Sequence, residues 1–301
     1  MEKEKQFYRH DEEIRYSRSM HTGPIGDNWV KGTEQIVEKS EDTIPDGKQT
    51  PDSYIFGFEK FITFDKNMIA VNAAKKVALK PKTAYNPLFI YGESGTGKTH
   101  LLKAIEDACT KNYPDMSIMY ITSEAFCNDV LYALKSGESW ELSEIRDLYR
   151  NQDVLLIDDL QFLIGKDVTL SELSFTIDAI LGGGNQIVFA ADRPPKAFNV
   201  SAHIKTKLAS GLVAELKAPS SSVRQNIIHV KASELGMQLN EDVVEYISSN
   251  AGSSIGEIEG ALTSILAYTE LYRPAVSLET AKEILKDIFG TEQNNSERGP
   301  Q

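Results

Sequence analysis

Cysteine is scarce in this chain of 301 residues: only Cys109 and Cys127 occur, and they share no short spacing. This excludes a disulfide framework and a cysteine metal site, and it predicts two free thiols in a reducing compartment. Long apolar runs are also missing, so no segment is expected to span a bilayer. The N-terminus, MEKEK, lacks the apolar stretch of a secretory signal. Together these absences predict a cytoplasmic protein with no membrane partner.

Positive charge is in short supply as well. The chain carries 32 Lys and Arg against 44 Asp and Glu, a net charge of −12. Such a field repels phosphates at long range, which disfavours loose binding to nucleic acid or to anionic membranes. A nucleic-acid role would therefore need a local basic or polar groove. With 41% apolar and 25% charged residues, the composition is typical of soluble globular proteins, and the length suffices for one sizeable domain plus a smaller one.

The first part of the chain, residues 1–53, has no sustained hydrophobic period. It is rich in Glu, Lys, Asp, Ser and Gly, with isolated aromatics. Such a segment cannot bury enough apolar surface to offset its ordering entropy, so we expect a mostly disordered N-terminal tail. The alternative is an arm that docks a partner through short motifs around Tyr8 and Trp29.

From Tyr54 onward, apolar strands alternate with amphipathic helices. A helix is expected from Lys98 to about Thr110, and Ser123 with Glu124 is expected to open another. The predicted strands are residues 87–91, 117–122, 154–157, 186–191 and a weaker 211–216. Strands that are apolar on both faces and separated by helices indicate a parallel sheet covered on both sides. The sequence therefore predicts an α/β domain over residues 54–217.

After Pro219 the strand patterns stop. Helices are predicted over residues 223–235, 241–250, 255–272 and 278–289. Their predicted N-caps are Ser220 to Ser222, Asn240, Ser253 or Ser254, and Ser277, and Gly236 is expected to end the first helix. We expect a small all-helical domain over residues 218–290 and a polar tail over residues 291–301, with no internal repeats.

A glycine-rich loop follows the first strand and has the G-x4-G-K-T pattern of a phosphate-binding loop. Glycines let backbone N–H groups wrap a β-phosphate, while Lys98 and the helix dipole attract the β- and γ-phosphates. Thr99 is expected to ligate Mg²⁺. The sequence context, an apolar strand before and an amphipathic helix after, argues against an ordinary glycine turn. The predicted ATP- and ADP-binding residues are Gly92, Glu93, Ser94, Gly95, Thr96, Gly97, Lys98, Thr99 and His100.

Two acids, Asp158 and Asp159, end the third predicted strand. Unpaired buried carboxylates are costly, so they should face a cation or a solvated cleft. We expect Asp158 to hold the hydration shell of Mg²⁺ and Asp159 to orient or deprotonate the attacking water. The alternative is a pair of acids that caps the next helix.

Asp192 ends the fourth predicted strand and precedes Arg193, Pro194 and Pro195. A polar side chain there could point at a γ-phosphate from beside the metal site. Taken alone, the string indicates an extended exit from a strand, because proline restricts the preceding residue. Its functional meaning comes from its order after the loop and the acid pair.

These residues resemble the AAA+ domain of the bacterial replication initiator DnaA. The resemblance extends over about residues 54–290, and its most specific strings are Asp-Asp-x-Gln-Phe and Asp-Arg-Pro-Pro. The stretches that carry it are residues 84–92 and 97–102 (phosphate loop), 155–163 and 165–166 (acid pair), 185–188 and 192–196 (first sensor), and 257–262 (lid helix). It implies a P-loop NTPase fold in which a parallel sheet flanked by helices is followed by a small helical lid.

The resemblance also implies an activity and partners. It implies ATP-dependent assembly of initiator subunits, or self-assembly through AAA+ surfaces, together with binding to single-stranded DNA and contact with a replicative helicase. By resemblance, Phe58 and Phe61 lie in the segment lining the base, Asn67 lies nearby, and Asp192 is the first sensor. The family's DNA-gripping helical insert corresponds to residues 128–150, whose available cations are Lys135, Arg146 and Arg150. A solvated helix face is an equally good interpretation of these three.

Four departures from the family pattern bear on turnover. A helix-turn-helix domain after the lid and an N-terminal helicase-contacting domain are expected to be missing. Lys207 stands at the position of the trans-acting arginine finger, and Gly256 stands at that of the lid arginine. Lysine keeps the charge but lacks the planar fork of arginine. We therefore expect nucleotide binding with slow hydrolysis, unless Arg193, His203 or Lys205 substitutes.

Three functions remain open from the sequence. The first is a DnaA-like ATPase without a duplex-reading domain, acting in replication initiation or its regulation; a part of a longer initiator is a variant of it. The second is a helicase-loader or transposition-helper ATPase, a class that usually carries glycine where Gln161 stands here. The third is a non-hydrolysing adaptor with structural nucleotide, which the intact Asp158 and Asp159 disfavour.

Overall fold

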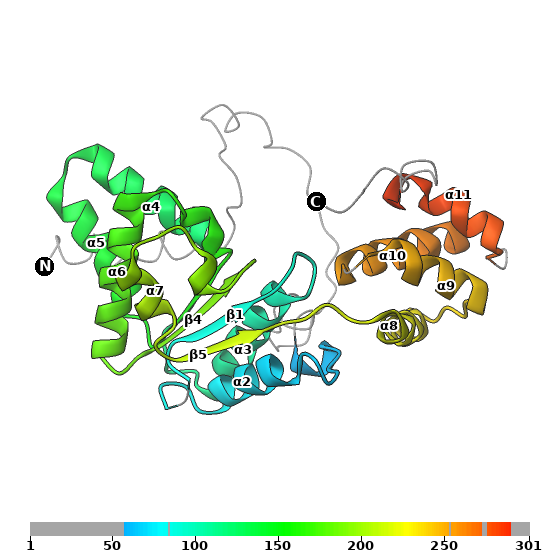
Figure 1. Cartoon of the computed structure of the whole chain (residues 1–301), viewed down its shortest axis with the longest axis horizontal. Coiled ribbons are helices and arrows are strands. Elements are labelled where there is room, and N and C mark those ends of the chain that lie inside the picture. Colours follow the sequence, from blue (N-terminus) through cyan, green and yellow to red (C-terminus); the bar gives the residue numbers. More distant parts are fainter. Residues whose placement is uncertain (1–56, 84, 253, 273–275, 290–301) are drawn as a thin grey trace, which may run out of the picture. The chain divides into compact units, whose positions relative to one another are not determined.

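The computed structural model describes residues 57–83, 85–252, 254–272 and 276–289 (Figure 1). The predicted tails, residues 1–53 and 291–301, lie outside the described residues, and so do Tyr8 and Trp29. Within the described ranges, the longest and most apolar helices fall short of what a membrane crossing requires.

Five parallel strands form one sheet in the order β2-β3-β4-β1-β5. Their bounds are β1 Leu88–Tyr91, β2 Ile118–Thr122, β3 Val154–Asp158, β4 Gln186–Ala191 and β5 Leu212–Glu215. The predicted parallel sheet with flanking helices is confirmed. Since all strands run the same way, the ends of β1, β3 and β4 meet at one edge of the sheet.

Residue rows across the sheet explain why both of its faces are covered. Tyr120, Leu156, Val188, Leu88 and Leu212 lie side by side in register and all pack on one face. The next row along the strands, Ile121, Ile157, Phe189, Phe89 and Val213, packs on the opposite face. Strands that are apolar at successive positions thus supply two cores, one on each side.

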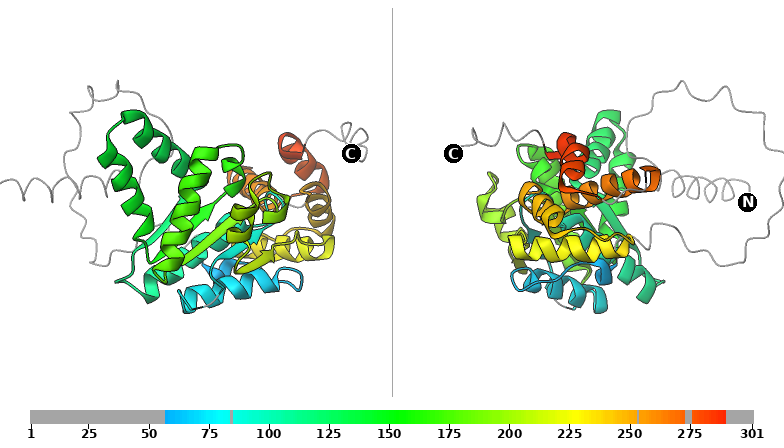
Figure 2. Two further views of the ribbon diagram at one scale, coloured as in Figure 1. Left: turned by 60° about the vertical axis from the view of Figure 1, so that its left-hand side comes forward. Right: turned by 90° about the vertical axis from the view of Figure 1, so that its right-hand side faces the viewer.

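Helices divide between these two cores (Figures 1 and 2). The helices α2 (Met68–Leu79) and α3 (Lys98–Asn112) cover the first. The second is covered by α4 (Ser123–Ser136), α5 (Ser139–Arg150), α6 (Asp167–Gly182) and α7 (Ala202–Leu208). Short 3₁₀ helices, η2 (Phe58–Lys60), η3 (Leu160–Leu163) and η4 (Pro195–Ala197), lie between the larger elements. We call residues 57–216 the αβα region.

Ser123 and Glu124 are the first two residues of α4, as predicted. Thr122 provides the cap, because its Oγ1 accepts the N–H of Ala125 at 3.2 Å. The Ser123 side chain is buried, and its Oγ donates to the carbonyl O of Asp159 at 2.5 Å. Ser123, the first residue of α4, therefore holds the backbone of Asp159 in place.

Four further helices follow: α8 (Ser221–Glu234), α9 (Glu241–Asn250), α10 (Ile255–Tyr272) and α11 (Leu278–Phe289). We call residues 221–289 the helical lid. It has a core of its own, built from residues such as Ile228, Val244 and Ile265. Ser277 caps α11 with a side-chain bond, whereas Ser220 and Asn240 occupy N-cap positions without one.

Candidate functional site

The phosphate loop connects β1 to α3, and two of its glycines are required by close approaches. A Cβ at Gly92 would lie 2.2 Å from the carbonyl O of Leu216, which a real side chain cannot tolerate. Gly97 has a φ of 97° and faces the ring of Phe61, so a side chain there is excluded by conformation and by space. The glycine spacing that predicted the loop is thus also what its packing demands.

Lys98 begins α3 and turns back into the loop. Its Nζ donates to the carbonyl oxygens of Gly92 and Glu93, both at 2.8 Å, and the residue is 8% exposed. Burial lowers the pKa of Lys98, while the carboxylates of Asp159 and Asp158 act in the opposite direction. A buried ammonium held by two neutral carbonyls is available to an anionic ligand, because a phosphate would compensate its charge better.

Asp158 ends β3 at the same edge of the sheet and is 1% exposed. Its Oδ2 accepts the hydroxyls of Thr99 at 2.6 Å and Tyr120 at 3.0 Å, and its Oδ1 accepts the N–H of Asp159 at 2.8 Å. Burial and the neighbouring carboxylate raise the pKa of Tyr120, so the phenol stays a hydrogen-bond donor. Both carboxylate oxygens are thus hydrogen-bonded, and Asp158 takes part in none of the ion pairs found among the described residues.

The Asp158 and Thr99 oxygens suit a hard cation such as Mg²⁺. Within the described part of the chain, no cluster of three or more His, Cys, Asp or Glu side chains could enclose a metal. Two protein oxygens are consistent with the usual coordination of Mg²⁺, which has few protein ligands and is completed by water and substrate phosphates. The residues therefore fit a metal that arrives with a phosphorylated ligand.

Asp159 follows in the left-handed conformation, with φ 54° and ψ 45°. Its Oδ1 accepts Gln161 Nε2 at 2.9 Å, and Gln161 Oε1 in turn accepts the backbone N–H of Asp192 at 3.2 Å. Gln161 thus connects the acid pair to the end of β4. Sequence reasoning used Gln161 only to separate related families and missed this bridge, although its fixed spacing from the acids was the signal.

The Asp192 side chain pairs with its neighbour. Both of its carboxylate oxygens accept from Arg193, at 2.8 Å from Nε and 2.6 Å from Nη2. Hydrogen bonds from Arg193 lower the pKa of Asp192. The fold brings Asp192 to the same sheet edge as Asp158, but it does not line the cavity described next.

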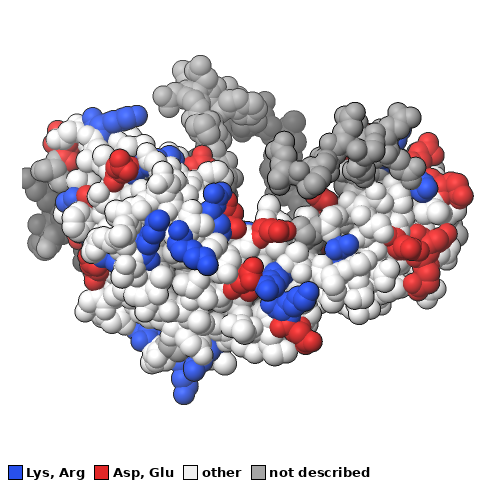
Figure 3. Space-filling view, in the orientation of Figure 1, with Lys and Arg blue, Asp and Glu red and all other residues white. Residues whose placement is uncertain are grey.

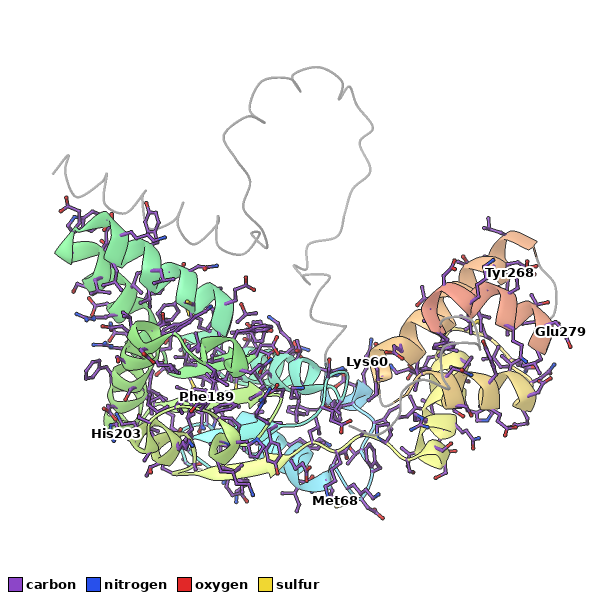
Figure 4. The ribbon with its side chains drawn as sticks, turned by 45° about the horizontal axis from the view of Figure 1, so that its top comes forward. Lys60, Met68, Phe189, His203, Tyr268 and Glu279 are labelled. Carbon is purple, nitrogen blue, oxygen red and sulfur yellow. The ribbon has the colours of Figure 1, made fainter. Side chains whose placement is uncertain are left out.

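A cavity of about 340 Å³ opens beside the loop. One wall is the phosphate loop with His100 and Asp159, and a second is formed by residues 60–62, with Lys60 labelled in Figure 4. The third wall belongs to the lid and comprises Lys231 on α8 and Ile255, Gly256 and Glu259 on α10. Of the predicted nucleotide-binding residues, Ser94, Gly95, Gly97, Lys98, Thr99 and His100 line it.

The wall expected to face a base is built around Phe61. Its ring meets the His100 ring edge-on, with centroids 5.3 Å apart and an angle of 82° between the planes. Burial lowers the pKa of His100, which favours the neutral imidazole. Asn67, 2% exposed, accepts the N–H of Phe64 and donates to the carbonyl O of Ile62, so it holds this segment in place. Phe58 packs at the margin of the core under α2 and α3.

The lid touches the phosphate loop directly. The N–H of Ile255, the first residue of α10, donates to the carbonyl O of Gly95 at 2.9 Å. Gly95 has a φ of 77°, and a Cβ there would lie 2.8 Å from the Cα of Ser254. Gly256 contributes no charge to the cavity, as predicted from the sequence, but Lys231 and Glu259 do. Sequence reasoning missed both as cavity residues.

Lys207 does not reach this cavity. Its Nζ donates to the carbonyl O of Ser174 at 3.2 Å, to Ser174 Oγ at 2.7 Å and to Asp178 Oδ2 at 2.6 Å. Its side chain is only 14% exposed. The predicted finger position is thus occupied by a lysine anchored on α6 of its own chain. His203, labelled in Figure 4, is exposed on α7.

Residues 128–150 fall on α4 and α5, and two of their three candidate cations are engaged. Arg146 donates to both carboxylate oxygens of Glu172, at 3.0 and 2.5 Å, and Arg150 Nη2 donates at 3.1 Å. Lys135 is exposed. On the face drawn in Figure 3, acidic and basic side chains of the described residues are interspersed rather than gathered into a basic band. Neither the DNA-contact interpretation nor the solvated-face interpretation predicted that Arg146 and Arg150 bind Glu172.

Comparison with known proteins gives a consistent result. A family model for the bacterial DnaA ATPase domain matches residues 53–215. The chromosomal replication initiator protein DnaA of Chloroflexus aurantiacus is 36% identical over 239 residues, which are 79% of this chain and 49% of that protein. The chain thus spans about half the length of this relative.

Solved structures agree with the sequence matches. Domain III of the Thermotoga maritima replication initiation protein DnaA superposes with a TM-score of 0.73 at 37% identity, covering 81% of this chain and 100% of that one. A replication initiator DnaA bound to AMPPCP and single-stranded DNA gives a TM-score of 0.65 at 31% identity, covering 72% of this chain and 65% of the other.

Proposed function

This chain belongs to the bacterial DnaA ATPase-domain family, and we propose that it is an ATP-binding switch acting in the initiation of DNA replication or in its regulation. The observation that carries the proposal is that Lys98, Thr99 and Asp159 line one cavity, with Asp158 bonded to the Thr99 hydroxyl at 2.6 Å. A similar protein of known structure was determined with AMPPCP, an ATP analogue. The ligand class proposed here is therefore an adenine nucleotide, ATP or ADP.

Each residue of the site has a proposed role. Lys98 exchanges its two carbonyl partners for the β- and γ-phosphates, while the loop N–H groups and the start of α3 face the β-phosphate. Thr99 and Asp158 hold Mg²⁺, which neutralises phosphate charge when bound. Phe61 and His100 face the nucleoside. The hydrogen bond between Thr99 and Asp158 fixes both oxygens before a ligand arrives.

Hydrolysis is proposed to be slow. Asp159 orients or deprotonates the attacking water. Gln161 bonds to Asp159 and to the backbone of Asp192, and so positions the Asp159 carboxylate relative to that sensor residue. An arginine finger contributes about 10³-fold or more in related NTPases. Here Lys207 is bound to Ser174 and Asp178, and Gly256 carries no charge, so neither of these two positions offers a free cation to the γ-phosphate. The chain is therefore proposed to keep ATP bound for long periods and to hydrolyse it slowly.

The family membership also suggests partners for this chain. We propose assembly with initiator subunits or with further copies of the chain through the αβα region and lid, as well as contact with single-stranded DNA; a replicative helicase is the remaining candidate. The DNA-bound relative supports the second of these. Because Arg146 and Arg150 hold Glu172, exposed Lys135 is the better candidate for a phosphate contact on α4 and α5.

Calorimetric titration with ATP and Mg²⁺ tests the proposal. Wild-type protein should bind, and Lys98→Ala should weaken binding by about 100-fold or more, because charge-assisted contacts to the phosphates are lost. Lys111→Ala, at the other end of α3, is the matched control and should bind like wild type. Absence of binding by the wild-type protein, or equal affinity of Lys98→Ala, would contradict the proposal.

A further inference from the structure

An ion pair in the lid faces the cavity and has no part in the function proposed so far. Lys231 Nζ on α8 donates to Glu259 Oε1 on α10 at 2.6 Å. The two side chains differ in exposure: that of Lys231 is 18% exposed and that of Glu259 is 52% exposed. Both residues line the cavity. The ammonium is thus held against the cavity wall by a partner that is itself half in solvent.

Breaking this ion pair costs little free energy, whereas a negatively charged ligand in the cavity is repelled by Glu259. An ion pair whose carboxylate is half exposed contributes little to stability, because solvent screens it and both long side chains lose freedom. A bound nucleotide brings several negative charges into the same cavity, where Glu259 opposes them and Lys231 attracts them. Among the described residues that form the lid wall of the cavity, Lys231 is the only Lys or Arg.

The position of the pair indicates which part of a nucleotide it meets. The cluster of acids at the strand ends acts on Lys98, at the loop end of the cavity. The lid pair instead acts on His100: burial lowers the pKa of His100, and as weaker influences Glu259 raises it and Lys231 lowers it. His100 packs on Phe61 at the nucleoside wall. Lys231 lines the cavity together with these two rings, and the phosphate next to a nucleoside is the α-phosphate, which ATP and ADP share.

We propose that Lys231 exchanges Glu259 for the α-phosphate of a bound nucleotide and so couples the lid to ATP and ADP alike. This assignment rests on the proposed function. It places a lid cation on α8, where Gly256 on α10 has none. It also distinguishes Lys231 from a γ-phosphate sensor: a contact common to both nucleotides adds affinity without telling them apart.

Titrations of ATP and ADP into Lys231→Met test the assignment. Both affinities should fall by about tenfold and by the same factor, since a charge-assisted contact shared by the two ligands is lost. Lys286→Met removes a lysine exposed on α11 outside the cavity, and it should leave both affinities unchanged. Thermal unfolding of each variant verifies that the lid is folded.

A second variant acts in the opposite direction. Glu259→Gln keeps the size of the side chain but releases Lys231 and removes a repelling charge, so both nucleotides should bind about twofold to fivefold more tightly. Unchanged affinity in Lys231→Met, or a loss confined to ATP, would overturn the assignment. Weaker binding in Glu259→Gln would overturn the exchange. Wild-type binding distinguishes these outcomes from failure of the proposed function, which would abolish binding in every variant.

Discussion

The αβα region and the helical lid meet at one cavity but present different kinds of groups to it. On the αβα side, Lys98 lines the cavity and Asp158 lies behind Thr99; both are buried, with two and three hydrogen bonds respectively. On the lid side, the contributions are one backbone N–H to Gly95 and the ion pair of Lys231 with the half-exposed Glu259. The αβα side thus offers groups that are fixed in position, and the lid offers an ion pair that can exchange its partner.

This contrast suggests a division of labour. Buried groups with satisfied hydrogen bonds keep their geometry, so they suit the phosphates and the metal, where position decides the chemistry. A screened ion pair changes partner at low cost, so it suits a segment that reports whether a ligand is present. Variants on the two sides should therefore fail in different ways.

The largest expected effect is on chemistry at the αβα side. Asp159→Asn should lower single-turnover phosphate release by about 100-fold or more, because the base or water-orienting carboxylate is lost. Asparagine tolerates the left-handed conformation of this residue, so the backbone should keep its shape. ATP affinity should remain within about twofold, since Lys98 and Asp158 are untouched.

Asp147→Asn, a change of the same kind on exposed α5, is the control for altered charge. An unchanged rate in Asp159→Asn would place the chemistry elsewhere. A large loss of ATP affinity would instead show that Asp159 belongs to the binding frame.

A smaller effect is expected where the two sides touch. Gly95→Ala adds strain of about 1 kcal/mol at a positive φ and places a Cβ 2.8 Å from the Cα of Ser254, so the lid must move away from the loop. Nucleotide affinity should fall by about tenfold in a titration.

Gly165→Ala provides the matched control, because Gly165 has a φ of 82° and its Cβ would meet open space. It carries similar backbone strain without the lid contact and should bind like wild type. Equal affinities of the two variants would mean that the lid contact contributes nothing to binding.

The sequence predicted the fold and drew attention to residues that line one side of the cavity, for a physical reason. Strands of a parallel sheet must be apolar on both faces, and polar residues at their ends stand out, so Asp158, Asp159 and Asp192 were visible beside the glycine loop. The Thr99 to Asp158 contact follows from where those strand ends meet. Gln161 was visible as a pattern, but its bridge required the register of β3 and β4.

Contacts between segments far apart in the chain could not be predicted in this way. Lys207 reaches α6, 29 residues away at Asp178, and nothing local to it indicates a partner. Lys231 and Glu259 are 28 residues apart on different helices, and each alone reads as a surface charge. Arg146 and Arg150 likewise find Glu172 only through the packing of α5 on α6.

Amide hydrogen exchange with and without ATP and Mg²⁺ tests the central claim, that nucleotide binds between the phosphate loop and the lid. Residues 92–99 and the start of α10, residues 255–259, are expected to slow their exchange together when nucleotide is added. Protection of the loop with no change at the start of α10, or no protection in either segment, would contradict it.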